Sequence, residues 1–271
     1  MIDKQSKIVI PEIVAGDSNQ PRIALTFDDG PHPVYTERLL DVLKRLRVKA
    51  TFFVVGSRVK MYSDTVKRMI IDGHELGNHT YHHVRFSNLP RGEVLPEFDR
   101  TSRLLALVTG GAPRLVRPPG GIYTPEITRL IASRGYINVL WTADPGDYKR
   151  NRTAHEIEVF SLRDISAGGI LLLHSGVQAT IDALPHIVQR LRSQGYVFST
   201  VSDLVLDGGV GMTRQSTSIK SLTRVHDYPE YIDMLTGMET QNVDYAEKLK
   251  MYQPNDSWLS LQRLLNRTIP R

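Results

Sequence analysis

Short apolar runs alternate with helix-forming stretches between residues 21 and 206, and this alternation restricts the fold more than any other feature of the chain. We expect strands over the seven runs at residues 23–27, 51–55, 74–78, 115–117, 137–142, 170–173 and 196–201. Several of these runs are rich in β-branched and aromatic residues, which strands prefer. Strands separated by helices form parallel βα arrays, either a barrel or a doubly wound sheet.

Helix signals fill the segments between these runs. Leu39, Leu43 and Leu46 recur at spacings of three and four, which predicts a helix with one buried face. Thr124 before Pro125 is a typical helix start, and residues 153–156 fit a capping box. We expect helices at residues 33–48, 63–72, 93–108, 124–135, 153–166 and 185–194.

Polar side chains gather where the expected strands end, and this favours a barrel over an open sheet. The set comprises Asp28, Asp29, His79, His83, Arg117, Asp144, Asp147 and His174. A barrel brings the carboxyl ends of its strands to one face, where its active site lies, whereas an open sheet scatters several of them. We therefore expect an α/β fold, a distorted, incomplete (β/α) barrel of about seven parallel strands over residues 21–206.

Two segments lie outside the alternation. Residues 1–20 form an N-terminal extension with a candidate edge strand at residues 8–10. Residues 207–271 form a C-terminal extension that we expect to be a loop followed mainly by helices. The last of these helices has an apolar face, which would pack on the barrel or on a second copy of the chain and make an oligomer.

The composition of the chain excludes several classes of site. There is no cysteine, so disulfides and thiolate ligands are ruled out, and Asp, Glu and His remain as metal ligands. The net charge of +5 is not concentrated in a run of basic residues, so the sequence predicts no nucleic-acid partner. No stretch approaches the roughly 18 apolar residues of a membrane span, and we expect no transmembrane segment.

Two adjacent carboxylates, Asp28 and Asp29, follow the first strand and precede a turn at Gly30 and Pro31. Neighbouring side chains of a strand point to opposite faces, so both carboxylates can face one site only where the backbone turns. Because like charges repel, such a site needs a cation to keep both groups ionised. Taken alone, the pair fits a helix cap equally well.

Histidines supply further candidate ligands. His79 and His83 are four residues apart, so a single helical turn could aim both at one ion. With Asp29 they make a set of two histidines and one carboxylate that leaves a coordination position open for water. The His74-Glu75 pair does not start a zincin motif, because His74 and His79 are five residues apart.

Five segments resemble, in their order and at plausible separations, the motifs of the polysaccharide deacetylases, the NodB-homology enzymes of carbohydrate esterase family 4. They are residues 26–30 (TFDDG), 79–83 (HTYHH), 117–121 (RPPGG), 144–148 (DPGDY) and 172–174 (LLH). The resemblance covers about residues 20–206 and leaves both extensions unexplained. It implies the hydrolytic removal of acetyl groups from a polysaccharide.

The resemblance also implies a role for each motif residue. Asp28 would be the general base, and Arg117 would orient it. His174 would be the general acid, with Asp147 as its carboxylate partner. Each proton transfer by these residues would raise the rate about a hundred- to ten-thousand-fold.

One divalent metal ion is the cofactor that the resemblance implies. Asp29, His79 and His83 would hold it, and we expect zinc, with cobalt or nickel as alternatives. Such an ion can lower the pKa of water from about 15.7 to about 7 while it polarises a carbonyl group.

Three further residues would contact the substrate by the same resemblance. Leu172 would line the pocket for the acetyl methyl group, and Gly120 and Tyr148 would border the groove. Family members often have an aromatic residue at the position of Gly120 and Trp at that of Tyr148. Both departures concern the substrate rather than the proposed chemistry.

We expect N-deacetylation of a polysaccharide that contains N-acetylglucosamine, of the peptidoglycan or chitin type, with release of acetate. The alternative is an O-deacetylase of xylan-like chains. A glycosidase is disfavoured, because adjacent Asp28 and Asp29 cannot flank a sugar at the roughly 5–9 Å that such enzymes need. A sugar-binding module is disfavoured because every catalytic position is filled. Such polymers lie outside the membrane, so we expect a secreted or wall-associated protein whose leader has been removed.

Overall fold

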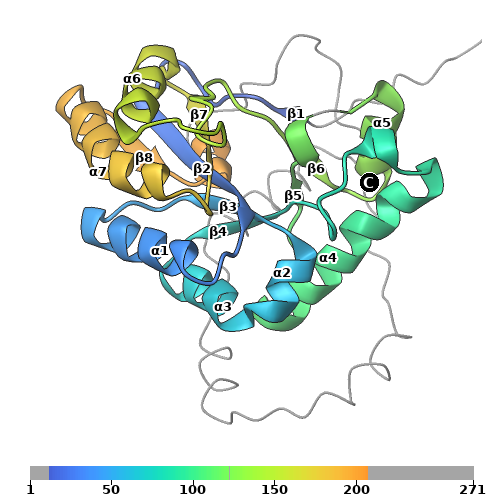
Figure 1. The fold of residues 1–271 in the computed structure, drawn as a ribbon. Coiled ribbons are helices and arrows are strands. Elements are labelled where there is room, and N and C mark those ends of the chain that lie inside the picture. The colour runs from blue at the N-terminus through green and yellow to red at the C-terminus, as the bar shows by residue number, and fades with distance from the viewer. Residues whose placement is uncertain (1–11, 122, 207–271) are drawn as a thin grey trace, which may run out of the picture. The chain divides into compact units, whose positions relative to one another are not determined.

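The computed structural model describes residues 12–121 and 123–206, which form a curved sheet with helices around its outside (Figure 1). The sheet has eight strands in the order β1-β6-β5-β4-β3-β2-β7, and β8 pairs with β2 beside this path. All the pairings between these strands are parallel. The strands are Glu12–Ile13 (β1), Arg22–Gly30 (β2), Thr51–Val54 (β3), Glu75–Asn78 (β4), Leu115–Val116 (β5), Ile137–Val139 (β6), Gly169–His174 (β7) and Val197–Ser199 (β8).

The two ends of the sheet meet only in part. Ala143, which follows β6, forms a single parallel bridge with Leu171 of β7. Next to it, the amide of Thr142 donates a hydrogen bond of 2.9 Å to the carbonyl of Ile170. The distorted, incomplete barrel expected from the sequence is therefore confirmed for the described residues. The expected helices of residues 207–271 and the strand at residues 8–10 lie outside the described part of the chain.

The helices cover the outer face of the sheet, and the main hydrophobic core lies between the two. Leu25 and Phe27 of β2 pack there against Leu39 and Leu43 of α1 and Leu184 of α7, all without exposed surface. The helices are Tyr35–Leu46 (α1), Gly56–Met61 (α2), Ser63–Ile71 (α3), Val94–Thr109 (α4), Pro125–Ser133 (α5), Ala154–Asp164 (α6), Gln178–Ser193 (α7) and Val201–Leu206 (α8). Short 3-10 helices lie at Phe86–Asn88 (η1), Arg91–Glu93 (η2) and Pro119–Gly121 (η3).

Local sequence signals place most helix starts correctly. Thr124 caps α5 with Pro125 as its first residue, and Thr153 and Glu156 form the expected capping box of α6. The start of α7 was expected at Pro185 but lies at Gln178, so Pro185 is inside the helix. The helix continues across the proline because its buried face extends on both sides, and this burial offsets the loss of one backbone hydrogen bond.

Several other elements were not expected from the sequence, namely β1, α2, α8 and the three 3-10 helices. The two-residue strand β1 adds an edge beside β6, and its shortness leaves no period to detect. Helix α2 is a six-residue helix before α3, and Tyr62 is the only residue between them.

Membrane spans were sought among the described helices. None of them combines the length and apolar character that crossing a bilayer requires.

Candidate active site

The side chains of Asp28 and His174 are brought together by the register of two neighbouring strands. In the parallel pair β2 and β7, Asp28 lies opposite His174 and Thr26 lies opposite Leu172. Alternate residues of a strand share one face, and the intervening Phe27 belongs to the outer core. The four paired residues therefore lie on the inner face of the barrel, at and below its carboxyl end.

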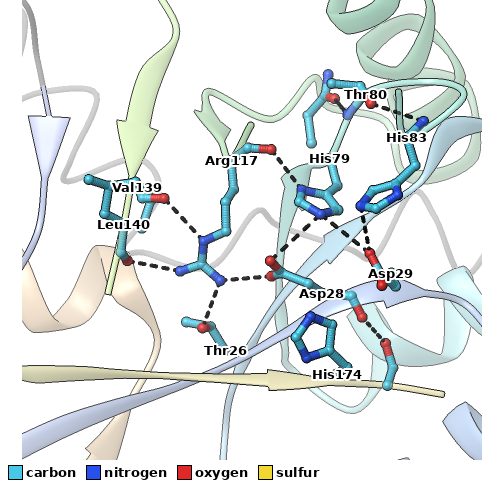
Figure 2. Close-up of polar contacts among 12 residues, drawn as sticks. Thr26, Asp28, Asp29, His79, Thr80, His83, Arg117, Val139, Leu140 and His174 are labelled. Carbon is cyan, nitrogen blue, oxygen red and sulfur yellow. Dashed lines mark hydrogen bonds and ion pairs between the residues drawn. The ribbon is translucent and has the colours of Figure 1, made fainter. Parts of the chain in front are cut away.

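Arg117 has no exposed surface and fixes the position of the Asp28 carboxylate. Its Nη1 donates to Oδ1 of Asp28 at 2.7 Å and to Oγ1 of Thr26 at 2.9 Å. Its Nε and Nη2 donate to the carbonyls of Val139 and Leu140 at 3.1 and 2.9 Å. Figure 2 shows this guanidinium spanning from the β6 end to Asp28. Since the ion pair is buried and fully hydrogen-bonded, Asp28 is held in one orientation.

Asp29, His79 and His83 converge beside Asp28 (Figure 2). Oδ1 of Asp29 lies 3.0 Å from Nε2 of His83 and 3.4 Å from Nε2 of His79. Oδ2 of Asp28 lies 3.6 Å from the same atom of His79. Burial raises the pKa of Asp29, but the imidazoles of His79 and His83 outweigh burial and hold that pKa well below its ordinary value.

The backbone at these ligands adopts a conformation that is uncommon outside glycine. Asp29, Thr80 and His83 have positive φ angles of 67°, 67° and 58°. At Asp29 this turn lets the second carboxylate face the same site as Asp28, although the two are neighbours in sequence. Such residues persist only where the surroundings over-determine them, and they cluster at functional sites.

The residues present fit a divalent cation. Nδ1 of His79 lies 2.7 Å from the carbonyl of Arg117, which can only accept, so Nδ1 carries the proton and Nε2 of the neutral ring presents a lone pair. That lone pair faces Oδ1 of Asp29, a buried atom without a hydrogen-bond partner among the described residues. A cation between these atoms would relieve their repulsion. Ligands around tetrahedral zinc lie about 3.4 Å apart, which matches the separations here.

His174 and Asp147 form the second charged pair of the site. Oδ1 of Asp147 lies 2.7 Å from Nδ1 of His174, and Oδ2 accepts from the His174 amide at 2.8 Å. Burial lowers the pKa of His174, but the hydrogen bond and charge of Asp147, together with the charges of Asp28 and Asp29, raise it to about 9. His174 is therefore a protonated imidazole at neutral pH, with Nε2 as its free donor.

Comparisons with known proteins identify the family to which the chain belongs. Residues 15–139 match the family model described as Polysaccharide deacetylase. A peptidoglycan-N-acetylglucosamine deacetylase of Bacillus cereus is 37% identical over 193 residues, which are 69% of this chain and 90% of that protein. The chain belongs to the polysaccharide deacetylase family. The peptidoglycan-N-acetylmuramic acid deacetylase PdaC of Bacillus subtilis is 38% identical over 202 residues, 74% of this chain but only 42% of PdaC.

Solved structures of deacetylases share the fold. The Bc1960 peptidoglycan N-acetylglucosamine deacetylase has a TM-score of 0.70 and 32% identity, covering 72% of this chain and 93% of that one. BA3943 of Bacillus anthracis, described as a CE4 family pseudoenzyme, has a TM-score of 0.68 and 28% identity, covering 73% and 69% of the two chains. Membership of the deacetylase family therefore does not by itself establish catalysis, and the argument for activity depends on the side chains of the site.

The three residues expected to contact substrate lie at different depths. Leu172 is 4% exposed and lies two residues before His174 on β7, on the same inner face. Tyr148 is 56% exposed, and its ring meets that of His174 edge-on at 5.2 Å. Gly120 lies in the η3 loop after β5 with a φ of 68°. The next residue, Gly121, is closely covered by Trp141, because a Cβ there would come within 2.4 Å of the indole.

Sequence analysis missed three residues that support the site. Oγ1 of Thr180 donates to Oδ2 of Asp147 at 2.6 Å, and Oγ of Ser175 donates to the Asp28 carbonyl at 2.7 Å. Thr180 lies in the first turn of α7, whose start was misplaced, so no signal marked it. Glu97 binds the segment between His79 and His83, although nothing in its helical spacing distinguishes it from a surface carboxylate.

Proposed function

We propose that the chain is a metal-dependent hydrolase that removes acetyl groups from the N-acetylated sugars of peptidoglycan, releasing acetate and leaving free amines. One observation carries the proposal: Asp28 lies between a cation-binding triad on one side and a protonated His174 on the other. The names of the relatives favour peptidoglycan as the substrate class.

The base acts on the attacking water. A bound divalent ion supplies Lewis acidity, polarising the acetyl carbonyl and lowering the pKa of water. Oδ1 of Asp28 is occupied by Arg117, so Oδ2, on the side of the ligand triad, is the atom that accepts the proton of the attacking water. Arg117 keeps this oxygen in place through the reaction, because all three nitrogens of its guanidinium also donate to backbone or hydroxyl oxygens.

The acid acts on the leaving nitrogen. An amine departs only after protonation, and Nε2 of His174 is the donor that the site offers. Asp147 holds the ring from behind and stabilises its charge. As the water proton passes to Asp28, the water oxygen forms a bond to the acetyl carbon. The C–N bond then breaks as His174 gives its proton to nitrogen, which leaves a free amine and acetic acid, ionised to acetate at neutral pH.

Acetate release from three polymers tests the function directly. With zinc supplied, we expect release from peptidoglycan, less from chitin oligomers, and least from acetylated xylan, and we expect a chelator to abolish it. Release from xylan alone would favour an O-deacetylase. Cleavage of glycosidic bonds, detected as new reducing ends, would favour a glycosidase. Binding without acetate release would indicate a pseudoenzyme.

The metal ligands can be tested without substrate. We expect one equivalent of zinc, cobalt or nickel per chain and a loss of this binding in His79→Ala, because Nε2 of His79 is the most buried of the histidine donors. Elemental analysis and equilibrium dialysis would check both. His155→Ala, on the exposed face of α6, is the control. A parent protein without stoichiometric metal would refute the site.

Peptidoglycan lies outside the cytoplasmic membrane, so we propose that the protein acts there. Fractionation of its native cells should recover it from the wall or the medium. Recovery from the cytoplasm alone would contradict this location.

A further inference from the structure

Glu97 is a buried carboxylate that the proposed chemistry does not use. It lies in the first turn of α4 and is 8% exposed. Among the described residues, the hydrogen bonds of its carboxylate oxygens go only to the segment 79–83, whose two ends are the proposed ligands His79 and His83. A buried carboxylate that is directed at a single loop needs an explanation, because burying such a group is costly unless its bonds are required.

The bonds of Glu97 fix the backbone between the two histidines. Its Oε2 accepts from the amides of Tyr81 and His82 at 3.0 and 2.7 Å. Its Oε1 lies 2.6 Å from Nδ1 of His82, whose side chain is 54% exposed. Two consecutive amides that converge on one oxygen restrict both peptide planes. Hydrogen bonds to an ionised acceptor are also the stronger kind.

The same segment is held from its other side by α2. The amides of Gly56 and Ser57, at the start of α2, donate to the carbonyls of Thr80 and Tyr81 at 2.9 and 3.0 Å. The left-handed residues Thr80 and His83 lie on either side of the Glu97 contacts. Because neither is glycine, the loop needs external bonds to keep this shape.

We propose that Glu97 is a positioning residue for the metal site, which it serves by holding the 79–83 loop so that His83 reaches Asp29. The inference rests on the metal site of the proposed function. His83 depends on this support more than His79 does. The ring of His79 is fixed directly by the Arg117 carbonyl, whereas among the described residues the ring of His83 contacts only Asp29 and His79.

Metal affinity tests the proposal without any substrate. Zn²⁺ and Co²⁺ are titrated into the metal-free protein in competition with a chromophoric chelator. Glu97→Met keeps the length of the side chain but removes its acceptors, and we expect metal binding about 10- to 100-fold weaker, as for other residues that hold ligands in place. Glu97→Gln keeps one acceptor oxygen for the two amides and should stay within about threefold of the parent. Glu93→Ala, on the exposed residue that precedes α4, is the matched control.

Each outcome decides the matter. Parent-like affinity in Glu97→Met would overturn the role of Glu97. A loss of affinity in Glu97→Gln and in the control Glu93→Ala as large as that in Glu97→Met would overturn it as well. If Glu97→Met does not fold, Glu97→Asp replaces it, since its shorter carboxylate cannot reach both amides. A parent-like affinity of Glu97→Asp would then overturn the proposal. A parent that binds no metal would refute the proposed function as well, whereas a parent that binds normally confines any failure to Glu97.

Discussion

Asp28→Asn should lower the rate of acetate release by at least about a hundredfold while the protein still binds its metal ion. The amide that replaces the carboxylate still accepts from Nη1 of Arg117, so the side chain keeps its place. It cannot take a proton from water, however, so only the proton transfer is lost. Steady-state rates on N-acetylated oligosaccharides, with metal content measured on the same samples, would check this.

The stability of the Asp28→Asn variant has to be measured in the same experiment, because Asp28 is the ion-pair partner of buried Arg117. Arg117 has no exposed surface, and its hydrogen bonds other than that to Asp28 are to neutral oxygens. Removing the carboxylate leaves a buried charge uncompensated, which typically lowers the free energy of unfolding by about 3–5 kcal/mol. The variant must therefore be assayed well below its own melting temperature. Activity within a few-fold of the parent in a folded, metal-loaded variant would show that Asp28 is structural.

His174→Ala should separate two kinds of substrate. An amide nitrogen must be protonated to leave, whereas nitrophenolate leaves as an anion. We therefore expect at least about a hundredfold loss on an N-acetylated sugar and only a few-fold loss on nitrophenyl acetate. His155→Ala, an exposed histidine of α6, is the control that should change neither rate. An equal loss on both substrates would assign His174 to binding or folding instead.

The pH dependence of amide cleavage follows from the same residue. The charges that surround His174 raise its pKa to about 9, and the acid is lost as the pH rises through that value. A bound divalent ion would offset the charges of Asp28 and Asp29, so the basic limb should lie between the ordinary His value of about 6.5 and 9. Asp147→Asn removes the hydrogen-bonded anion and should move this limb to lower pH. A limb that stays in place would contradict the pairing.

The sequence predicted seven of the eight described strands, because most of them coincide with short apolar runs. Some ends were misplaced: β6 ends at Val139 and β8 at Ser199, whereas the expected strands ran to residues 142 and 201. The sequence could not predict the register that places Asp28 opposite His174, which depends on the pairing of segments that are far apart in the chain, such as Thr26 with Leu172. The left-handed turn at Asp29 was anticipated only as a need for the backbone to turn. The local sequence does not predict the positive φ angle of Asp29, because the surrounding structure imposes that conformation.

Residues that support the site were the hardest to predict. Thr180 bonds to Asp147, 33 residues away, and Glu97 bonds to His82, 15 residues away. Threonine and glutamate side chains are most often on the surface, so nothing in the sequence marks these two as supports of the site. The ligand triad was easier, since histidine spacing and an acidic pair restrict the chemistry without any knowledge of packing. The motifs were sufficient to predict the chemistry, whereas the residues that hold the motif side chains in place could be found only from the three-dimensional structure.

One residue, Arg117, contacts both halves of the site through different atoms. Its guanidinium holds Asp28, while its own carbonyl sets the tautomer of His79. The base and the ligand His79 are therefore linked through a single buried residue that follows β5. A substitution at Arg117 would accordingly disturb proton transfer and metal binding together.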